Sequence, residues 1–451
     1  MQEFPGGRRG WMQEFDHHST AFAADWRGVY RDLRESCPVA RVPGHDGFTV
    51  LTRYDDIRQV LQSSKDFVCG RDLEIAGVPG TVPGGVTIPT NPFRMGMMEM
   101  DAPESLVLRR ILVPWFSVKA VDLHAVHIRD LVTWCIDRVI ESGRMDIVDD
   151  LANPLPALVT LDLLGLPLEN WQTYAGILHG AVYREKGSAK GLAWLLTDLR
   201  SIVRQRRVTP AAVPTPIDAM IGTQVDGAPL SEDMVVELVY MLLSGGVDTS
   251  TAIIAHCLRY LSAHPDVAAE LRRDESLLAG AVEEMLRYFS PGTGVARTAV
   301  HDTVIGGAQV KAGERVLVAL GAANSDPHQF DHPDELDIHR DARRHLAFGA
   351  GLHRCLGSFL APREVEILLS EVLRRMPDLR VAESGVRPYE AIPLVSGFRA
   401  MPATFTPGRK HGLIPADGLP PTRSERDLLR SAQLAAADAD PDTPEAASAI
   451  T

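Results

Sequence analysis

The sequence predicts a mainly α-helical protein with small β-sheets. Helical periodicity dominates residues 21–406, and strand-like runs such as Phe48–Thr52 and Arg315–Ala319 are short. The chain has 451 residues, of which 45% are hydrophobic, so it can bury a large core without disulfides or structural metals. This length suits one large domain or two to three ordinary ones.

Charge and cysteine usage narrow the class of protein. The 46 Lys and Arg against 59 Asp and Glu give a net charge of −13, which argues against non-specific nucleic-acid binding. The N-terminal sequence lacks the basic and apolar regions of a secretory signal. The five cysteines form no CxxC pair, which is typical of buried thiols in a reducing compartment. We therefore expect a cytoplasmic protein.

The strongest helical segment begins at Ser231, a good N-cap residue, and continues to about Ala263, before Pro265. About 33 residues at 1.5 Å each give a rod of about 50 Å, long enough to cross a whole domain. Polar residues such as Asp248 and His256 interrupt its apolar middle, and no aromatic belt flanks it. This pattern predicts a buried central helix rather than a membrane span.

Two adjacent glycines, Gly245 and Gly246, lie in the middle of this helix. Each costs about 1 kcal/mol relative to alanine in a helix interior, so a compensating reason is needed. One interpretation is close packing of another helix. The other is a flat ligand that lies against bare backbone, with Asp248 and Thr249 supplying an acid and a hydroxyl.

Cys355 differs from the other cysteines in its surroundings. Gly349 and Gly351 precede it in a loop, His353 and Arg354 adjoin it, and an apolar helical stretch follows it. Glycines allow turns that point backbone N–H groups at one atom, and a helix N-terminus stabilises a thiolate. Cys355 is therefore predicted to be a ligand or a nucleophile.

Three segments resemble the motifs of the cytochrome P450 superfamily. Phe348–Gly357 (FGAGLHRCLG) matches its haem-binding signature, Glu284–Arg287 (EMLR) its Glu-x-x-Arg helix, and Gly246–Thr249 (GVDT) its oxygen-activation motif. The resemblance is greatest to the soluble bacterial class I, actinomycete-like branch. It implies a P450 fold with haem between the long central helix and the helix after the cysteine loop.

The resemblance also implies the organisation of the chain. It runs from about residue 20 to residue 406, so residues 21–406 are expected to form a single domain after an N-terminal extension, residues 1–20. Residues 407–451 are rich in Pro, Ala, Asp and Ser and poor in apolar residues. We expect this tail to be largely disordered, with one short helix over residues 425–437.

By the same resemblance, Cys355 is the axial thiolate ligand of the iron of haem b, which favours O–O cleavage. Phe348 is expected to pack beside the ring, and His353, Arg297 and Arg109 to meet the anionic propionates. Ser105 stands where the family motif has a histidine. The remaining cofactor-binding residues that the resemblance implies are Gly349, Gly357, Gly245 and Gly246.

Two residue pairs carry further expected roles. Glu284 and Arg287 resemble the pair that locks the loop below the haem, and the alternative is a surface i,i+3 pair worth a few tenths of a kcal/mol. Asp248 and Thr249 resemble the catalytic acid and alcohol that relay protons during the activation of O₂. One departure stands in the helix after the cysteine, where Pro362 should remove a hydrogen bond and kink the helix.

The expected electron source is a separate ferredoxin with its ferredoxin reductase, which draws on NAD(P)H. Residues 339–363 carry five arginines against one aspartate around Cys355, a local charge of +4 in an acidic protein, which suits an acidic ferredoxin. The alternative is that these arginines bind propionates and carboxylates within the protein. The arginines are Arg340, Arg343, Arg344, Arg354 and Arg363.

The walls of the implied substrate pocket are mainly apolar, which predicts a hydrophobic small-molecule substrate. The expected reaction is insertion of one oxygen atom from O₂, as hydroxylation or epoxidation, in specialised metabolism. One alternative is oxidative coupling or another non-hydroxylating haem reaction, and another is a hydrolase with Cys355 as nucleophile and His353 as base. The expected pocket residues are Leu242, Leu243, Thr293, Gly294, Val295, Ala296 and Val395.

Overall fold

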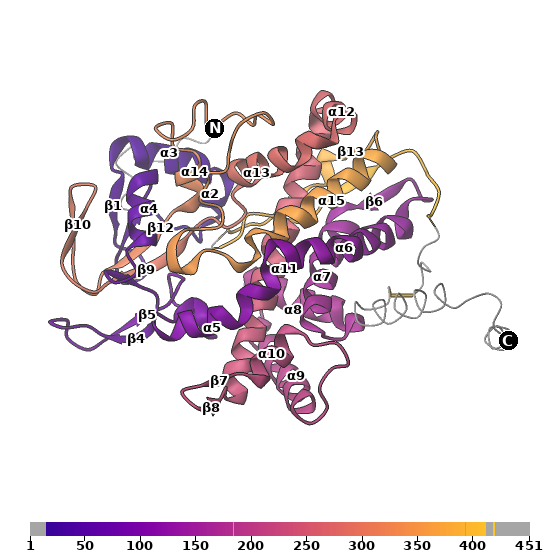
Figure 1. The fold of residues 1–451 in the computed structure, drawn as a ribbon. Helices are drawn as coiled ribbons and strands as arrows, with labels where there is room; N and C mark the ends of the chain where they lie inside the picture. The colour runs from indigo at the N-terminus through magenta and orange to yellow at the C-terminus, as the bar shows by residue number, and fades with distance from the viewer. Residues whose placement is uncertain (1–14, 184, 393, 412–417, 420–451) are drawn as a thin grey trace.

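The computed structural model describes residues 15–183, 185–392, 394–411 and 418–419. They form a mainly helical fold with small sheets, as the sequence predicted (Figure 1). Of the expected N-terminal extension, residues 15–20 are described, and Phe15 packs into a core cluster with 3% exposure. The helix expected over residues 425–437 lies outside the described residues.

The largest sheet has five strands in the order β1-β2-β12-β9-β3. The strand-like runs of the sequence form β2 and β12, which pair in parallel with Val316 opposite Thr49. β1 pairs with β2, and β9 with both β12 and β3, in antiparallel fashion. The strands are β1 (Val39–Val42), β2 (Phe48–Leu51), β3 (Phe67–Val68), β9 (Val295–Ala299) and β12 (Arg315–Val318).

Four helices accompany this sheet at one side of the molecule, where Figure 1 shows them in indigo and orange. The α4 helix contacts both β12 and α14, and α14 also contacts α3. These helices are α2 (Thr20–Ala24), α3 (Trp26–Ser36), α4 (Tyr54–Gln62) and α14 (Leu320–Asn324).

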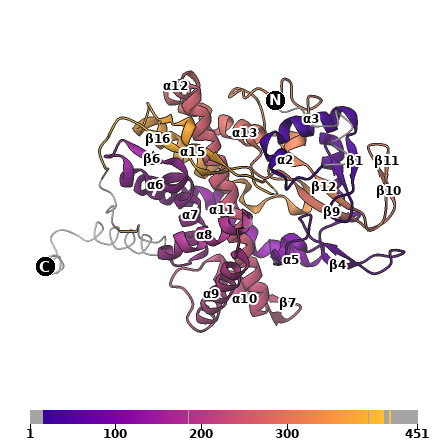
Figure 2. The same ribbon diagram turned by 180° about the vertical axis from the view of Figure 1, so that it is seen from behind.

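The α11 helix (Glu232–Ala263) runs through the middle of the molecule in both views (Figures 1 and 2). The Ser231 hydroxyl accepts a hydrogen bond from the Met234 N–H at 3.1 Å, which confirms the predicted N-cap. Its length and hydropathy are those of a membrane span, but 78% of its most apolar window is buried within the fold. Burial on this scale is the property of a core helix.

Helices from both halves of the chain pack around α11. Those in contact with it include α7 (Pro154–Leu164), α8 (Trp171–Val182), α9 (Ser188–Val208) and α15 (Leu360–Arg375). The remaining α-helices are α5 (Glu104–Leu112), α6 (Val118–Val139), α10 (Pro216–Gly222), α12 (Pro265–Arg273) and α13 (Leu278–Phe289). The short 3₁₀ segment used below is η8 (Leu356–Ser358).

The smaller sheets lie at the periphery of the fold. One has three strands in the order β13-β16-β6, and the others are strand pairs. Their strands are β4 (Arg71–Glu74), β5 (Thr81–Gly84), β6 (Arg144–Asp146), β7 (Gln224–Val225), β8 (Ala228–Pro229), β10 (Thr303–Ile305), β11 (Ala308–Val310), β13 (Arg380–Val381), β14 (Arg387–Pro388), β15 (Phe398–Ala400) and β16 (Pro402–Thr404).

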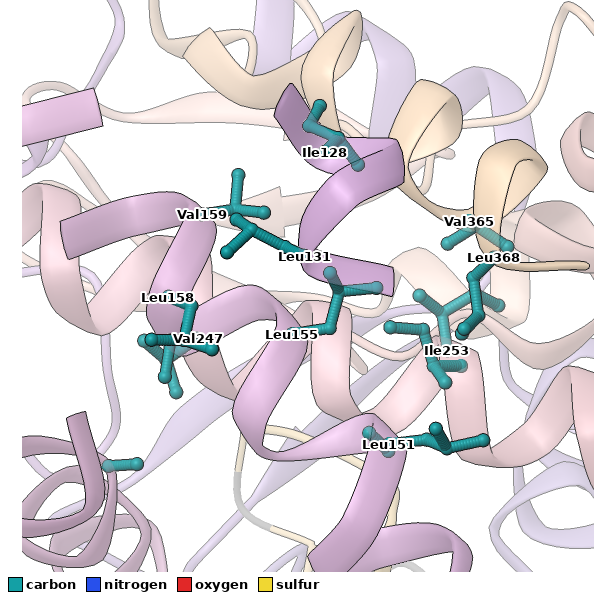
Figure 3. Packing of buried hydrophobic residues seen from close by; sticks show 14 of the residues in the cluster. Ile128, Leu131, Leu151, Leu155, Leu158, Val159, Val247, Ile253, Val365 and Leu368 are labelled. Atoms are coloured by element: carbon teal, nitrogen blue, oxygen red, sulfur yellow. The ribbon is translucent and has the colours of Figure 1, made fainter. Parts of the chain in front are cut away.

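The core joins α11 to the helix that follows the cysteine loop. Figure 3 shows Leu155 and Leu158 of α7 between Val247 of α11 and the side chains of α6, while Ile253 of α11 lies near Val365 and Leu368 of α15. All of these residues are almost fully buried. This packing fixes α11 and α15 relative to each other, and the loop before α15 is held beside α11.

The kink expected at Pro362 is wrong. The structure begins α15 at Leu360, after the separate η8 segment, so Pro362 lies in the first turn of the helix. The first four N–H groups of a helix have no acceptor within it, and a proline there removes no intrahelical hydrogen bond. The sequence placed the helix start too early, immediately after Cys355.

Candidate functional site

A cavity of about 380 Å³ lies between α11 and the loop that carries Cys355. Residues from α5, α7, α8, α11 and β9 line it, together with the 86–98 segment, the 347–361 loop and the start of α15. It brings together residues that are far apart in sequence, including Arg109, Asp248, Arg297 and Cys355. This cavity is the candidate site.

Two glycines shape the cysteine loop. Gly349 and Gly351 have φ of +65° and +68°, a region that favours glycine, and a Cβ on Gly351 would lie 2.3 Å from the Leu61 carbonyl oxygen. The loop closes on itself where the Cys355 N–H donates to the Phe348 carbonyl oxygen at 2.9 Å. The motif thus presents the sulfur from a tight turn at the start of η8.

Cys355 is exposed, whereas Cys69, Cys135 and Cys257 are buried and Cys37 is half-buried. Its surface faces the cavity. Although the sulfur faces the cavity, the protein atoms packed around it displace water and so raise the pKa of the Cys355 thiol. A hydrogen bond from the Gly357 N–H and the positive charges of Arg109 and Arg354 oppose this rise. A bound metal ion would replace this proton, because a coordinating thiol is deprotonated.

The same cavity holds cationic groups that have no carboxylate partner among the described residues. Arg297 is 5% exposed, and its guanidinium donates only to the Ala296 carbonyl oxygen, at 2.8 Å. Arg109 donates to the Arg354 carbonyl oxygen at 2.5 Å. A buried cation without a counter-charge is costly, so this end of the cavity is built to receive an anion.

Ser105 and His353 lie in the same part of the cavity. The Ser105 hydroxyl is buried and forms no hydrogen bond within the described part of the chain, so it can donate to a bound group. His353 Nε2 lies 3.1 Å from Cys69 Sγ, and burial, with Arg297 and Arg109 adding to it, lowers the pKa of His353 to about 3. No interaction between His353 and Cys355 is found, so the thiolate–imidazole pair that a cysteine hydrolase needs is not formed.

The two glycines of α11 serve different purposes. A Cβ on Gly246 would lie 2.7 Å from Thr160 Oγ1, so this glycine allows close packing of α7. A Cβ on Gly245 would meet nothing within 4 Å, because Gly245 faces the cavity. Gly246 therefore fits the helix-packing interpretation, and at Gly245 bare helix backbone lies across the cavity from Cys355, where the ligand interpretation stays a prediction.

These features fit the haem that the resemblance implies. A thiol in a glycine loop faces the cavity, Gly245 presents backbone without a side chain, and unpaired arginines meet the anionic end. Phe348, Gly349 and Gly357 also line the cavity, as expected.

Asp248 and Thr249 reach the cavity from α11. The Asp248 carboxylate is 2% exposed and pairs with His179 Nδ1 of α8. Thr249 Oγ1 donates to the Gly245 carbonyl oxygen at 2.9 Å, which leaves its lone pairs able to accept a proton. Sequence reasoning missed His179, because nothing in the pattern of α8 distinguishes it from an ordinary core histidine.

His179 connects Asp248 to further polar groups. Its ring stacks on Tyr183 with centroids 6.0 Å apart, and the Tyr183 hydroxyl donates to the Tyr389 hydroxyl at 2.6 Å. The buried Nε2 of His179 has no hydrogen-bond partner in the described ranges. A polar chain therefore runs from the cavity wall towards the β14–β15 region, but His179 and Tyr183 are joined in it by ring stacking and not by a hydrogen bond.

Glu284 and Arg287 form a buried fork rather than a surface pair. Arg287 donates to both Glu284 carboxylate oxygens, at 2.7 and 2.8 Å, and the two side chains have no exposed surface. Arg287 also donates to the carbonyl oxygens of Asn324, Pro333 and Glu335. Asn324 Oδ1 in turn accepts the Leu346 N–H at 2.6 Å, which connects the pair to the segment that leads into the cysteine loop.

The expected substrate-pocket residues divide into two groups. Leu242, Gly294, Val295 and Val395 line the cavity. Leu243, Thr293 and Ala296 are buried and are not among its lining residues; the Thr293 hydroxyl contacts the Ile392 and Leu394 carbonyl oxygens at 3.4 Å instead. Adjacent residues of a helix or strand point in different directions, so a continuous range could not all face one pocket.

Sequence reasoning also missed part of the lining. Thr160 and Leu163 of α7 line the cavity, and so does Glu364 of α15, whose Oε1 is buried without a partner among the described atoms. Burial raises the pKa of Glu364 to about 8. The apolar run of α7 gave no signal, because α7 is buried on all sides.

Comparisons with known proteins find relatives of this chain. The family model described as cytochrome P450 matches residues 200–377. The chain is 36% identical over 365 residues to cytochrome P450-SU2 of Streptomyces griseolus, covering 79% of this chain and 86% of that protein. It is 33% identical over 377 residues to 6-deoxyerythronolide B hydroxylase of Saccharopolyspora erythraea, covering 81% and 92%.

A solved structure shows the same fold. Mycobacterium marinum cytochrome P450 CYP268A2, in complex with pseudoionone, superposes with a TM-score of 0.79 at 25% sequence identity, covering 90% of this chain and 100% of that one.

Proposed function

This chain belongs to the cytochrome P450 family, and from that premise we propose that it inserts one oxygen atom from O₂ into a hydrophobic small molecule, by hydroxylation or epoxidation. It is a bacterial P450 monooxygenase related to enzymes of specialised metabolism. The observation that carries the proposal is the placement of Cys355 Sγ on a cavity that also holds unpaired arginines. We further propose a cytoplasmic location.

The residues of the cavity have distinct roles toward the cofactor. Haem b, when bound, supplies a thiolate-ligated iron that activates O₂. Cys355 Sγ would bind the iron, and Arg109, Arg297, His353 and Ser105 would hold the propionates. Phe348, Gly349, Gly357 and Gly245 shape the cavity around the ring, while Gly246 serves helix packing.

Asp248 and Thr249 deliver protons from the α11 side. The Thr249 hydroxyl donates to the Gly245 carbonyl, so it can accept a proton on one lone pair and release another by rotating away from that carbonyl. Asp248 adjoins it on the helix and is held by His179. The pair thereby connects the interior of the cavity to a buried polar chain.

The apolar side chains that line the cavity near α11 support the proposal of an apolar substrate. Leu242, Val295 and Val395 line this region together with methionines of the 95–98 segment, which adapt to irregular ligands. One relative is named 6-deoxyerythronolide B hydroxylase, and a related structure is in complex with pseudoionone. We therefore propose oxidation of a specialised metabolite of this type.

The electron donor in this proposal is a ferredoxin, reduced by a ferredoxin reductase that uses NAD(P)H. Support comes from exposed cations near the cysteine loop: Arg344 and Arg354 form no ion pair in the described ranges. Arg354 lies over the exposed Phe359 ring, 5.8 Å from its centroid, and Phe359 and Val118 line a surface groove of about 330 Å³. Asp122, Glu283 and Glu366 also line this groove, so the support for an acidic partner comes from Arg344 and Arg354 and not from the groove itself.

A reduced carbon monoxide difference spectrum tests the thiolate ligation. A strongly red-shifted Soret band is expected for the purified protein and for Cys37→Ser, a matched substitution outside the cavity. Cys355→Ser should lose the band. A wild-type protein that binds haem without the band, or a Cys355→Ser protein that keeps it, contradicts the assignment.

Labelled oxygen tests the reaction itself. Compounds that shift the Soret band identify ligands, and turnover with ¹⁸O₂ should then place one labelled oxygen atom in the product. Turnover that couples or rearranges the substrate without incorporating label would support the alternative, a non-hydroxylating haem reaction.

A further inference from the structure

We propose that His17, His18 and His45 form a zinc-binding site on the surface of the domain, separate from the cavity. One ring nitrogen from each residue lies within 4.8 Å of those of the other two. His17 and His18 precede α2, and His45 lies in the turn between β1 and β2. Residues from two separate segments therefore converge on one point.

The spacing of the nitrogens suits a shared metal ion. His17 Nε2 and His18 Nε2 are 3.0 Å apart, and two nitrogens on one tetrahedral zinc at about 2.0–2.1 Å lie about 3.3 Å from each other. The ring centroids of His17 and His45 are 5.9 Å apart, and those of His18 and His45 are 5.2 Å apart. A small movement of the exposed His45 side chain completes the site.

The surrounding contacts hold the rings in place. Asp16 Oδ1 lies 3.4 Å from His45 Nε2 and also accepts the His18 N–H at 2.8 Å. A carboxylate beside a metal-binding histidine orients the ring and raises its basicity. His18 Nε2 also lies 2.7 Å from the Ile88 carbonyl oxygen, and it must release this contact to bind zinc, because a nitrogen that donates its proton has no free lone pair. Asp16 is thus the group that supports the site.

The His17 ring is held in place by the core. His17 is 3% exposed, and its ring packs edge-on against Phe48 with centroids 5.7 Å apart, while its Nε2 faces His18. A set of imidazole ligands suits zinc rather than magnesium or calcium. Zinc here would fasten the start of the domain to the edge of the five-stranded sheet.

Zinc titration of the haem-loaded, full-length protein tests the proposal. The protein carries no histidine tag and is first treated with a chelator, and binding is followed by calorimetry and by zinc analysis after dialysis. We expect one zinc per chain. His45→Ala should weaken binding by at least about tenfold, since even the loss of an orienting partner costs tenfold or more. His45 is exposed, so this variant should fold normally, as its Soret spectrum and thermal unfolding can verify.

His301→Ala is the matched control. His301 is also an exposed histidine beside a carboxylate, with Nε2 3.6 Å from Asp66 Oδ1, but it lies outside the cluster. Its zinc affinity should equal that of the wild type. Absence of zinc binding, unchanged affinity in His45→Ala, or equal binding of Mg²⁺ would each overturn the proposal.

Discussion

The pairing of His179 with Asp248 makes the acid of α11 depend on a residue of α8. Both side chains are more than nine-tenths buried. Removing one partner leaves the other buried with an unmet hydrogen bond or charge, which is far more costly than losing an exposed pair. The proposed catalytic acid, Asp248, is therefore also part of the packing between two helices.

A double-mutant cycle measures this dependence. We expect His179→Ala and Asp248→Asn each to lower the free energy of unfolding, by roughly 1–3 kcal/mol, because each leaves a buried polar group unpaired. The double variant should lose less than the sum, with a coupling energy on the order of 1 kcal/mol or more. The measurement is urea unfolding of the four proteins, and simple additivity would show that the two side chains do not interact.

Thr249 is expected to affect the use of electrons rather than stability. Without its hydroxyl the proton path is broken, so Thr249→Ala should bind haem normally, but most of the electrons from NAD(P)H should reduce O₂ to hydrogen peroxide instead of forming product. Thr251→Ala is the matched control, because the Thr251 hydroxyl donates to the Ala152 carbonyl and does not line the cavity. The ratio of product to NAD(P)H decides: an unchanged ratio in Thr249→Ala refutes the relay.

At the scale of helices and loops, Arg287 joins α13 to the segment that leads into the cysteine loop. A lysine cannot reproduce its planar fork or its carbonyl contacts. We expect Arg287→Lys to lose roughly 3–5 kcal/mol of stability and to be purified largely without haem. The reason is that the buried Glu284 carboxylate loses the two parallel hydrogen bonds from the guanidinium group. Unfolding by urea and the ratio of haem to protein are the measurements.

Arg259→Lys provides the control for this substitution. Arg259 makes a similar fork with Glu383, at 3.1 and 2.6 Å, but on the surface. Its replacement should change stability by less than about 1 kcal/mol. A soluble Arg287→Lys protein with full haem content would contradict the structural role.

Local signals in the sequence predicted the elements well. The N-cap Ser231, the strand-like runs of β2 and β12, and the glycine loop before Cys355 depend on neighbouring residues, and the structure confirms each of them. Motifs likewise located Arg109 and Arg297, whose unpaired guanidinium groups became visible only in the folded chain.

Tertiary contacts could not be predicted from the sequence. His179 meets Asp248, 69 residues away, and nothing local records that contact. The start of α15 depends on how η8 packs, so Pro362 was misplaced in the helix. Thr293 and Ala296 were assigned to the pocket as part of a range, although the direction of each side chain decides whether it lines a cavity.

At the scale of the whole molecule, the stretch around Cys355 offers less positive charge to a partner than its composition indicates. Arg340 donates to Glu284, Arg343 pairs with Asp341, and Arg363 pairs with Glu366. The alternative of internal ion pairs therefore accounts for three of the five arginines. Arg344 and Arg354 remain as exposed arginines of this stretch without an ion pair in the described ranges.

These cations predict a salt-dependent association with an acidic ferredoxin. Reversing the charge of Arg344 with Arg344→Glu should lower the second-order rate of electron transfer by about tenfold at low salt, because steering charges act mainly on the association rate. The difference should fade at about 1 M salt, where the Debye length is only about 3 Å.

Lys190→Glu makes the same charge change on the exposed surface of α9 and should have little effect. Stopped-flow reduction by ferredoxin measures the rate, and reduction by dithionite verifies that the haem site is intact. An equal loss in both variants, or a loss independent of salt, would mean that the protein's overall charge, and not this face, governs the encounter.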